Sequence, residues 1–150
     1  REHGHGRRGG RGPLHRSAAG AEVEAGGAGG GAMPIVDVTL VGKAPATATL
    51  AADLAQAIGQ ALGAAEGTVW VTLHRFAAGD YAENGPPPES LPVFVRVLAR
   101  GDDSPSRAAQ AQSIAAAVAS RLGRPVERVH VIFEPDAAGR VCFGGQPGGG

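Results

Sequence analysis

The sequence contains 150 residues, and its 14 Lys and Arg balance its 14 Asp and Glu, so the formal net charge is zero. This length suits one domain, and the balanced charge gives no reason to expect nucleic acid or a membrane surface as a partner. A single cysteine, Cys142, excludes an internal disulfide and fits a reducing compartment, so we expect a cytoplasmic protein. No apolar run approaches the roughly 20 residues that a membrane-spanning helix needs.

Residues 1–32 differ in composition from the rest of the chain. They are rich in Gly, Arg, His and Ala, with too few large apolar side chains to offset the entropy of ordering, which predicts a disordered extension. Residues 7–12 are similar to an arginine–glycine RNA-binding segment, and three histidines are candidates for a metal site: His3, His5 and His15. The alternatives are a flexible tail without function and a start assigned too far upstream. We also predict a flexible tail over residues 147–150.

Residues 34–85 form a predicted β-α-β unit. The first strand alternates, with Pro34, Val36, Val38 and Leu40 on one face and Ile35, Asp37, Thr39 and Val41 on the other. The apolar spacing predicts a helix over residues 49–65. A second strand follows over residues 68–76, where Trp70 is expected to serve in packing. A polar loop then ends in the tight-turn signal Asn84-Gly85.

Residues 91–146 repeat this unit. Its predicted parts are a strand over residues 91–98, a helix that opens at Ser104-Pro105 and ends at Leu122-Gly123, a strand over residues 129–133, and a short strand or hairpin over residues 140–145. The repeat of residues 33–40 by residues 91–98 aligns Pro92 with Pro34. Two tandem β-α-β units predict an α/β domain over residues 33–146, with a four-stranded sheet and two helices on one face. Because no third helix is available to cover the other face, we expect an oligomer.

The head and the tail of this domain resemble a known family. The head is Met33-Pro34-Ile35-Val36-Asp37-Val38, and the tail comprises residues 126–134 followed by Gly139-Arg140-Val141-Cys142-Phe143-Gly144-Gly145. Together with the tandem unit, these segments resemble the tautomerase superfamily, the group of 4-oxalocrotonate tautomerase and macrophage migration inhibitory factor. The resemblance implies a cofactor-independent isomerase. It also implies a homotrimer with active sites between subunits, because two-unit members typically form trimers.

By this resemblance, Pro34 is the catalytic base or acid once it is the first residue of the chain. A free α-amino group titrates near 8, and burial or a nearby cation lowers that value. Such a nitrogen can take a proton next to a carbonyl and return it elsewhere. The nitrogen of Pro92 is an amide and cannot act as a base, so we expect one proline site per chain. The plain alternative for Pro34 is a proline that opens a strand.

Four further residues are candidates for binding a small carboxylate substrate. Arg100 and Lys43 lie at matching ends of the two first strands, where family members often place an arginine; Lys43 lacks the bidentate geometry of arginine. His130 occupies a strand position where relatives use an arginine or tyrosine, and Tyr81 lies in the loop after the first unit. Each residue also has an ordinary structural interpretation, as a solvated charge, a sheet histidine or a loop packing residue. No metal is expected.

The sequence therefore predicts a tautomerase that moves a proton on a small 2-oxo or 2-hydroxy-dienoate acid. A close alternative within the family keeps Pro34 protonated and adds water to an unsaturated, halogenated or unhalogenated acid. A third alternative is a non-catalytic oligomeric binding protein, which gains support if residues 1–32 are retained and the Pro34 nitrogen stays an amide.

Overall fold

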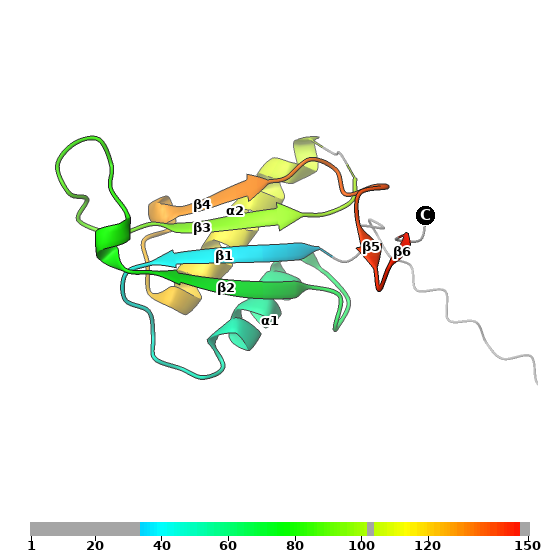
Figure 1. Ribbon diagram of the computed structural model, residues 1–150, viewed down its shortest axis with the longest axis horizontal. Coiled ribbons are helices and arrows are strands. Elements are labelled where there is room, and N and C mark those ends of the chain that lie inside the picture. Colours follow the sequence, from blue (N-terminus) through cyan, green and yellow to red (C-terminus); the bar gives the residue numbers. More distant parts are fainter. Residues whose placement is uncertain (1–33, 102–103, 148–150) are drawn as a thin grey trace, which may run out of the picture.

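A computed structural model describes residues 34–101 and 104–147 (Figure 1). The predicted extension over residues 1–32, the residue Met33 and the last three residues of the predicted tail lie outside the described residues. The elements in chain order are β1 (Ile35–Val41), α1 (Leu50–Leu62), β2 (Trp70–Phe76), η1 (Ala78–Asp80), β3 (Val93–Leu98), α2 (Ser104–Leu122), η2 (Val126–Arg128), β4 (Val129–Phe133), β5 (Cys142–Phe143) and β6 (Gln146–Pro147).

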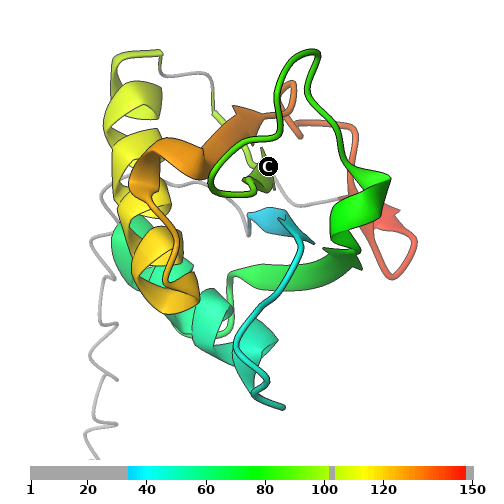
Figure 2. The ribbon, with the colours of Figure 1, turned by 90° about the vertical axis from the view of Figure 1, so that its left-hand side faces the viewer.

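The two predicted β-α-β units are confirmed, and they share one sheet. Its strand order is β2-β1-β3-β4, with parallel pairs inside each unit and an antiparallel pair, β1 with β3, between the units. Both helices lie on the same face of this sheet (Figure 2). No helix within the described ranges is both long and apolar enough to cross a membrane.

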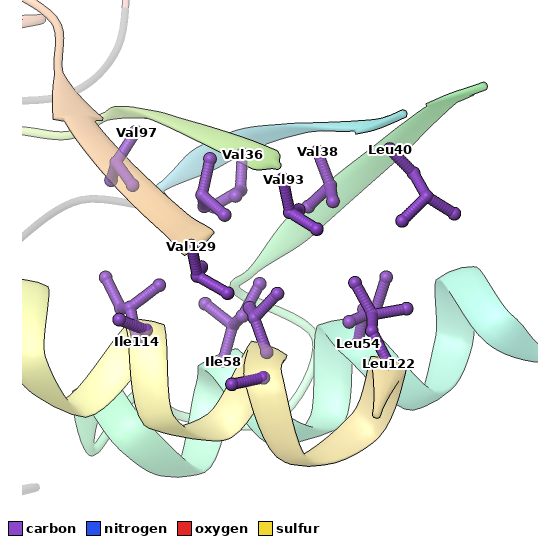
Figure 3. Packing of buried hydrophobic residues seen from close by; sticks show 14 of the residues in the cluster. Val36, Val38, Leu40, Leu54, Ile58, Val93, Val97, Ile114, Leu122 and Val129 are labelled. Atoms are coloured by element: carbon purple, nitrogen blue, oxygen red, sulfur yellow. The ribbon is translucent and has the colours of Figure 1, made fainter. Parts of the chain in front are cut away.

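The core lies between the sheet and the two helices (Figure 3). The alternation predicted for β1 is observed, since Val36, Val38 and Leu40 are fully buried against the helices. The other strands and the helices supply the remaining core side chains: Val93, Val95, Val97, Val129, Leu50, Leu54, Ile58, Ile114, Ala115, Val118, Ala119 and Leu122. Full burial of a Val, Leu or Ile side chain contributes roughly 1.5–3 kcal/mol, so this layer provides the main stabilisation of the domain.

The opposite face of the sheet, called the open face below, is not covered by a helix. Its side chains alternate with the core residues and mix apolar with charged groups: Ile35, Asp37 and Thr39 on β1, Trp70, Thr72, His74 and Phe76 on β2, Phe94, Arg96 and Leu98 on β3, and His130 and Ile132 on β4. Trp70 and Phe76 are 45% and 46% exposed. Trp70 is the first residue of β2 and Phe76 the last, so the two exposed rings lie at opposite ends of this face.

The predicted alignment of Pro92 with Pro34 is wrong by one residue. That alignment matches Val36 with Phe94, yet Val36 faces the helices and Phe94 faces the open side. A shift of one residue exchanges the two faces of a strand, so the repeats superpose only when Val36 is matched with Val95. Pro92 therefore lies one position upstream of the place that Pro34 occupies in the first unit.

The antiparallel pairing of β1 with β3 gives the sheet two distinct ends. Ile35 pairs with Leu98, so β1 begins where β3 ends, and we call this side the Pro34 end. Leu40 pairs with Val93, so β1 ends where β3 begins, and we call this side the Lys43 end. The hairpin of β5 and β6 lies at the Pro34 end, and the loop before β3 lies at the Lys43 end (Figure 1).

Arg124, just after α2, links the end of β1 to the segment before β3 at the Lys43 end. Its guanidinium donates to the carbonyl oxygens of Val41 and Lys43, both at 2.7 Å, and to that of Leu91. Partial burial lowers the pKa of Arg124, but an arginine still remains charged at any pH at which the protein is folded. One cation therefore holds the end of β1 against the start of the second unit.

We expect Arg124→Met to lower the free energy of unfolding by about 2 kcal/mol or more, because each hydrogen bond from a charged group contributes about 1.5–3 kcal/mol. The matched control is Arg121→Met in the last turn of α2, whose exposed side chain should cost less than about 1 kcal/mol. Urea unfolding of the two variants measures the difference. Equal losses would contradict the tying role of Arg124.

Candidate active site

Pro34 lies immediately before β1 and is buried. Its carbonyl oxygen accepts a hydrogen bond from the backbone N–H of Trp70 at 3.1 Å, which fixes the start of β1 against β2. The next residue, Ile35, pairs with Trp70 on one side and with Leu98 on the other. Pro34 is thus held against β2 through its carbonyl oxygen, at the end of the sheet where β1 begins.

A cavity of about 290 Å³ lies on the open face at this same end. Its lining comes from β1, β3 and the segment after β4: Ile35, Asp37, Arg96, Leu98, Glu134, Pro135 and Arg140. The segment after β4 is held in place by two backbone hydrogen bonds, from Glu134 to Val97 at 2.9 Å and from Ala137 to Ala99 at 3.1 Å. The apolar floor of the cavity is formed by Ile35 and Leu98. Ile35 directly follows Pro34 in the chain, and Leu98 is its partner on β3.

The charged side chains of this cavity differ in how they are paired. Arg96 donates to Glu134 at 3.1 Å, and the two side chains are 52% and 38% exposed. Asp37 accepts a hydrogen bond from the hydroxyl of Thr72, and His74 lies 3.7 Å away from the same carboxylate oxygen. Arg140 is exposed, and its guanidinium has no partner among the described residues. It is therefore the cation in this cavity that an incoming carboxylate can pair with at the least cost.

The structure separates the four predicted substrate-binding residues. Arg100 follows β3 and lies at the Pro34 end. Lys43 follows β1 and lies at the opposite end, roughly 20 Å away along a seven-residue strand. There Lys43 lines a separate, open cavity of about 710 Å³ together with Glu89 and Arg124. Within one chain, Lys43 and Pro34 do not share a cavity.

Tyr81 and His130 also lie at the Lys43 end. The Tyr81 hydroxyl donates to Glu83 at 2.8 Å, and Arg128 donates to the same carboxylate oxygen at 2.6 Å. The Phe94 ring lies between the rings of Tyr81 and His130, with centroid distances of 6.2 and 5.5 Å. His130 is exposed on the open face. The two predicted residues therefore come together with each other, but not with Pro34 of the same chain.

Two arginines of the cavity, Arg96 and Arg140, were not among the predicted site residues. The alternation of β3 would have placed Arg96 on the open face, opposite Asp37 of β1. Arg140 belongs to a segment whose path across the end of the sheet has no periodic signal in the sequence. Within the described ranges, no group of three His, Cys, Asp or Glu side chains could hold a metal ion, and His3, His5 and His15 lie outside those ranges.

The contacts of Glu83 lead to a pH-dependent prediction. Hydrogen bonds from Arg128 and Tyr81 lower the pKa of Glu83, while burial and Glu83 raise the pKa of Tyr81. A lowered carboxyl pKa stabilises the fold above its ordinary value of 4.5, and this stabilisation is lost as the pH falls through the lowered value. We expect wild type to exceed Glu83→Gln in free energy of unfolding at pH 7, with the gap closing below pH 4.5.

The control for this experiment is Glu89→Gln, an exposed carboxylate on the same loop. Its stability difference from wild type should stay small and constant between neutral and acidic pH. A Glu83→Gln difference that does not change with pH would contradict the contact with Arg128.

Comparison with solved structures identifies the fold. The chain is 21% identical to a fused 4-OT asymmetric trimer, with a TM-score of 0.63 over 75% of this chain and 94% of that one. It is 20% identical to Pt0534 inactivated by 2-oxo-3-pentynoate, with the same TM-score and coverage. It is 25% identical to MIF2 of Leishmania major, with a TM-score of 0.53 over 70% and 90% of the two chains. No family model and no curated protein matches the sequence.

These similarities cover nearly the whole length of each solved structure and include both two-unit 4-OT and MIF proteins. They agree with the sheet order and helix placement described above. The resemblance that the sequence pattern predicts is thus confirmed at the level of architecture, and the chain has the fold of the tautomerase superfamily.

Proposed function

We propose that the protein is a cofactor-independent tautomerase in which an amino-terminal Pro34 moves a proton on a small 2-oxo or 2-hydroxy-dienoate acid. The observation that carries this proposal is the position of Pro34. It directly precedes Ile35, which lines a cavity that combines apolar side chains with the guanidinium groups of Arg96 and Arg140. A cavity of this kind fits a small, partly apolar carboxylate. The fold shared with 4-OT and MIF structures supports the same activity.

The chemistry needs only one group that both accepts and donates a proton. The Pro34 nitrogen removes the hydroxyl proton of the 2-hydroxy-dienoate while the electrons of that O–H bond form the 2-oxo group. The conjugated double bond shifts, and the protonated nitrogen returns its proton to a carbon at the far end of the conjugated system. No electron acceptor is required, because the product is an isomer of the substrate. An arginine beside the carboxylate stabilises the negative charge that develops during the transfer.

The environment of Pro34 suits this role when the nitrogen is free. Burial disfavours the charged form of an amine and lowers its pKa from the ordinary value of about 8 toward neutral pH. An amine with such a pKa is present as a base at neutral pH and still forms a competent acid after it takes a proton. An upstream peptide bond would turn the nitrogen into an amide and abolish the activity. The proposed mature enzyme therefore begins at Pro34.

The active form is proposed to be a homotrimer. The open face of the sheet is not covered by a helix, and a fused 4-OT of this fold is a trimer. Contact between chains would bring the Lys43 end of one subunit toward the Pro34 end of its neighbour. In such an arrangement Lys43, Tyr81 and His130 can contribute to a site whose base is supplied by another chain, and Arg100 contributes from the chain of Pro34.

A pair of chains that differ only at the amino terminus tests the proposal. The chain that begins at Pro34 should ketonise 2-hydroxymuconate or phenylenolpyruvate, with a rate that falls as the pH drops below the pKa of the amine. The same chain with one alanine added before Pro34 should lose about 10²–10⁴-fold in kcat/KM, because the base becomes an amide. Equal activity of both chains would contradict the proposal. A rate that falls as the pH rises instead would indicate a required acid and favour the hydratase alternative.

A covalent label gives an independent test. 2-Oxo-3-pentynoate is an electrophilic alkyne, to which a free secondary amine adds while its proton passes to carbon, without a leaving group. We expect the chain that begins at Pro34 to gain the mass of one whole reagent on Pro34, with loss of activity. The chain with the added alanine is the control and should remain unlabelled at Pro34. Labelling at Cys142, the exposed thiol, with activity retained would contradict the role of Pro34.

A further inference from the structure

An apolar row crosses the open face directly beside Pro34. Trp70 of β2, Ile35 of β1 and Leu98 of β3 are cross-strand neighbours in register, and all three point away from the helices. Ile35 and Leu98 form the floor of the cavity that also contains Arg140. The row therefore runs without a charged side chain from the cavity to the ring of Trp70.

The C-terminal segment holds this ring in a fixed orientation. After β4, the chain crosses the Pro34 end of the sheet and places the hairpin of β5 and β6 beside β2 (Figure 1). Phe143 of this hairpin meets Trp70 edge to face, with ring centroids 5.4 Å apart and an interplanar angle of 90°. The indole N–H of Trp70 donates to the carbonyl oxygen of Gly67 at 3.3 Å. An aromatic ring that is held on two sides and still 45% exposed is suited to stack on a flat ligand.

Two cations, Arg96 and Arg140, line the cavity, and Trp70 is not among its lining residues. Arg140 has no partner among the described side chains, and Arg96 lies beside it in an ion pair with Glu134. A ligand carboxylate can pair with Arg140. A second carboxylate that lay against the rings of Trp70 and Phe143 would lose water there, whereas a flat apolar tail would bury apolar surface.

We propose that Trp70, braced by Phe143, selects substrates with one carboxylate and a flat apolar tail, such as aryl-substituted enols of 2-oxo acids, over dicarboxylates. This inference rests on the proposed function, because it concerns the substrate of the same proline. Trp70 is a specificity-determining residue that contacts the tail of the substrate, and Phe143 is a positioning residue that acts through Trp70.

The test measures kcat/KM for two enols with the chain that begins at Pro34. Phenylenolpyruvate carries one carboxylate and a ring, and 2-hydroxymuconate carries two carboxylates. Wild type should prefer phenylenolpyruvate. Trp70→Ala should lower this preference about tenfold, mainly through a higher KM for the aryl acid, since one aromatic contact is worth up to about tenfold in binding. Trp70→Phe should restore most of it, which separates the stacking role from a loss of folding.

Three further variants make the result specific. Phe76→Ala removes another half-exposed aromatic side chain from the same strand and face, but at the Lys43 end, and it should leave the preference unchanged. Arg140→Ala should raise KM for both acids by a similar factor, because both have a carboxylate to pair with it. Phe143→Ala should shift the preference in the same direction as Trp70→Ala but by less.

The outcomes distinguish this inference from the proposed function. If the added alanine before Pro34 abolishes both rates and Trp70→Ala leaves their ratio unchanged, the selectivity inference is wrong and the tautomerase proposal stands. A wild-type preference for 2-hydroxymuconate would also overturn the inference. If the wild type turns over neither acid, or if the added alanine changes neither rate, both proposals are overturned.

Discussion

The antiparallel pairing of β1 with β3 is the constraint on which the rest of the structure depends. Each β-α-β unit has only two strands and one helix, and the single core contains side chains from both units. Pairing Val38 with Val95 joins the units into one four-stranded sheet and lets both helices cover the same face. The same pairing brings the end of the second unit to the start of the first. Ile35, the residue after Pro34, therefore shares a cavity with Glu134, Pro135 and Arg140 of the second unit.

This arrangement gives the two ends of the sheet different surroundings although the two units are similar. At the Pro34 end, the strand of the second unit ends and its C-terminal segment crosses over to β2, supplying Arg140 and Phe143. At the Lys43 end, the loop between the units and Arg124 line a separate cavity, and Arg124 hydrogen-bonds to the carbonyl oxygens of Val41 and Lys43. The repeat is thus symmetrical in its core and asymmetrical at its two ends, where chemistry can take place.

The sequence was sufficient for the parts of the fold that depend on local pattern. Alternation assigned the two faces of β1 and β2, and helical spacing located α1 and α2 to within a few residues. The sequence could not show how the two units pair. Lys43 and Arg100 therefore had equivalent predicted positions, whereas in the antiparallel sheet they lie at opposite ends. Aligning Pro92 with Pro34 was wrong by one residue because a proline pair marks a strand's start, whereas the buried face fixes its register. The contact between Trp70 and Phe143 joins residues far apart in the chain, and no periodic pattern in the sequence predicts it.

The central claim is that Pro34 has a free nitrogen in the active protein. The most direct measurement is the intact mass, together with amino-terminal sequencing, of the protein purified from the cells that make it. We expect a chain that begins at Pro34, with a secondary amine on the residue that precedes Ile35 of the cavity. A mature and functional chain that retains residues upstream of Pro34 would leave the fold unchanged but contradict the mechanism, because the base would then be an amide.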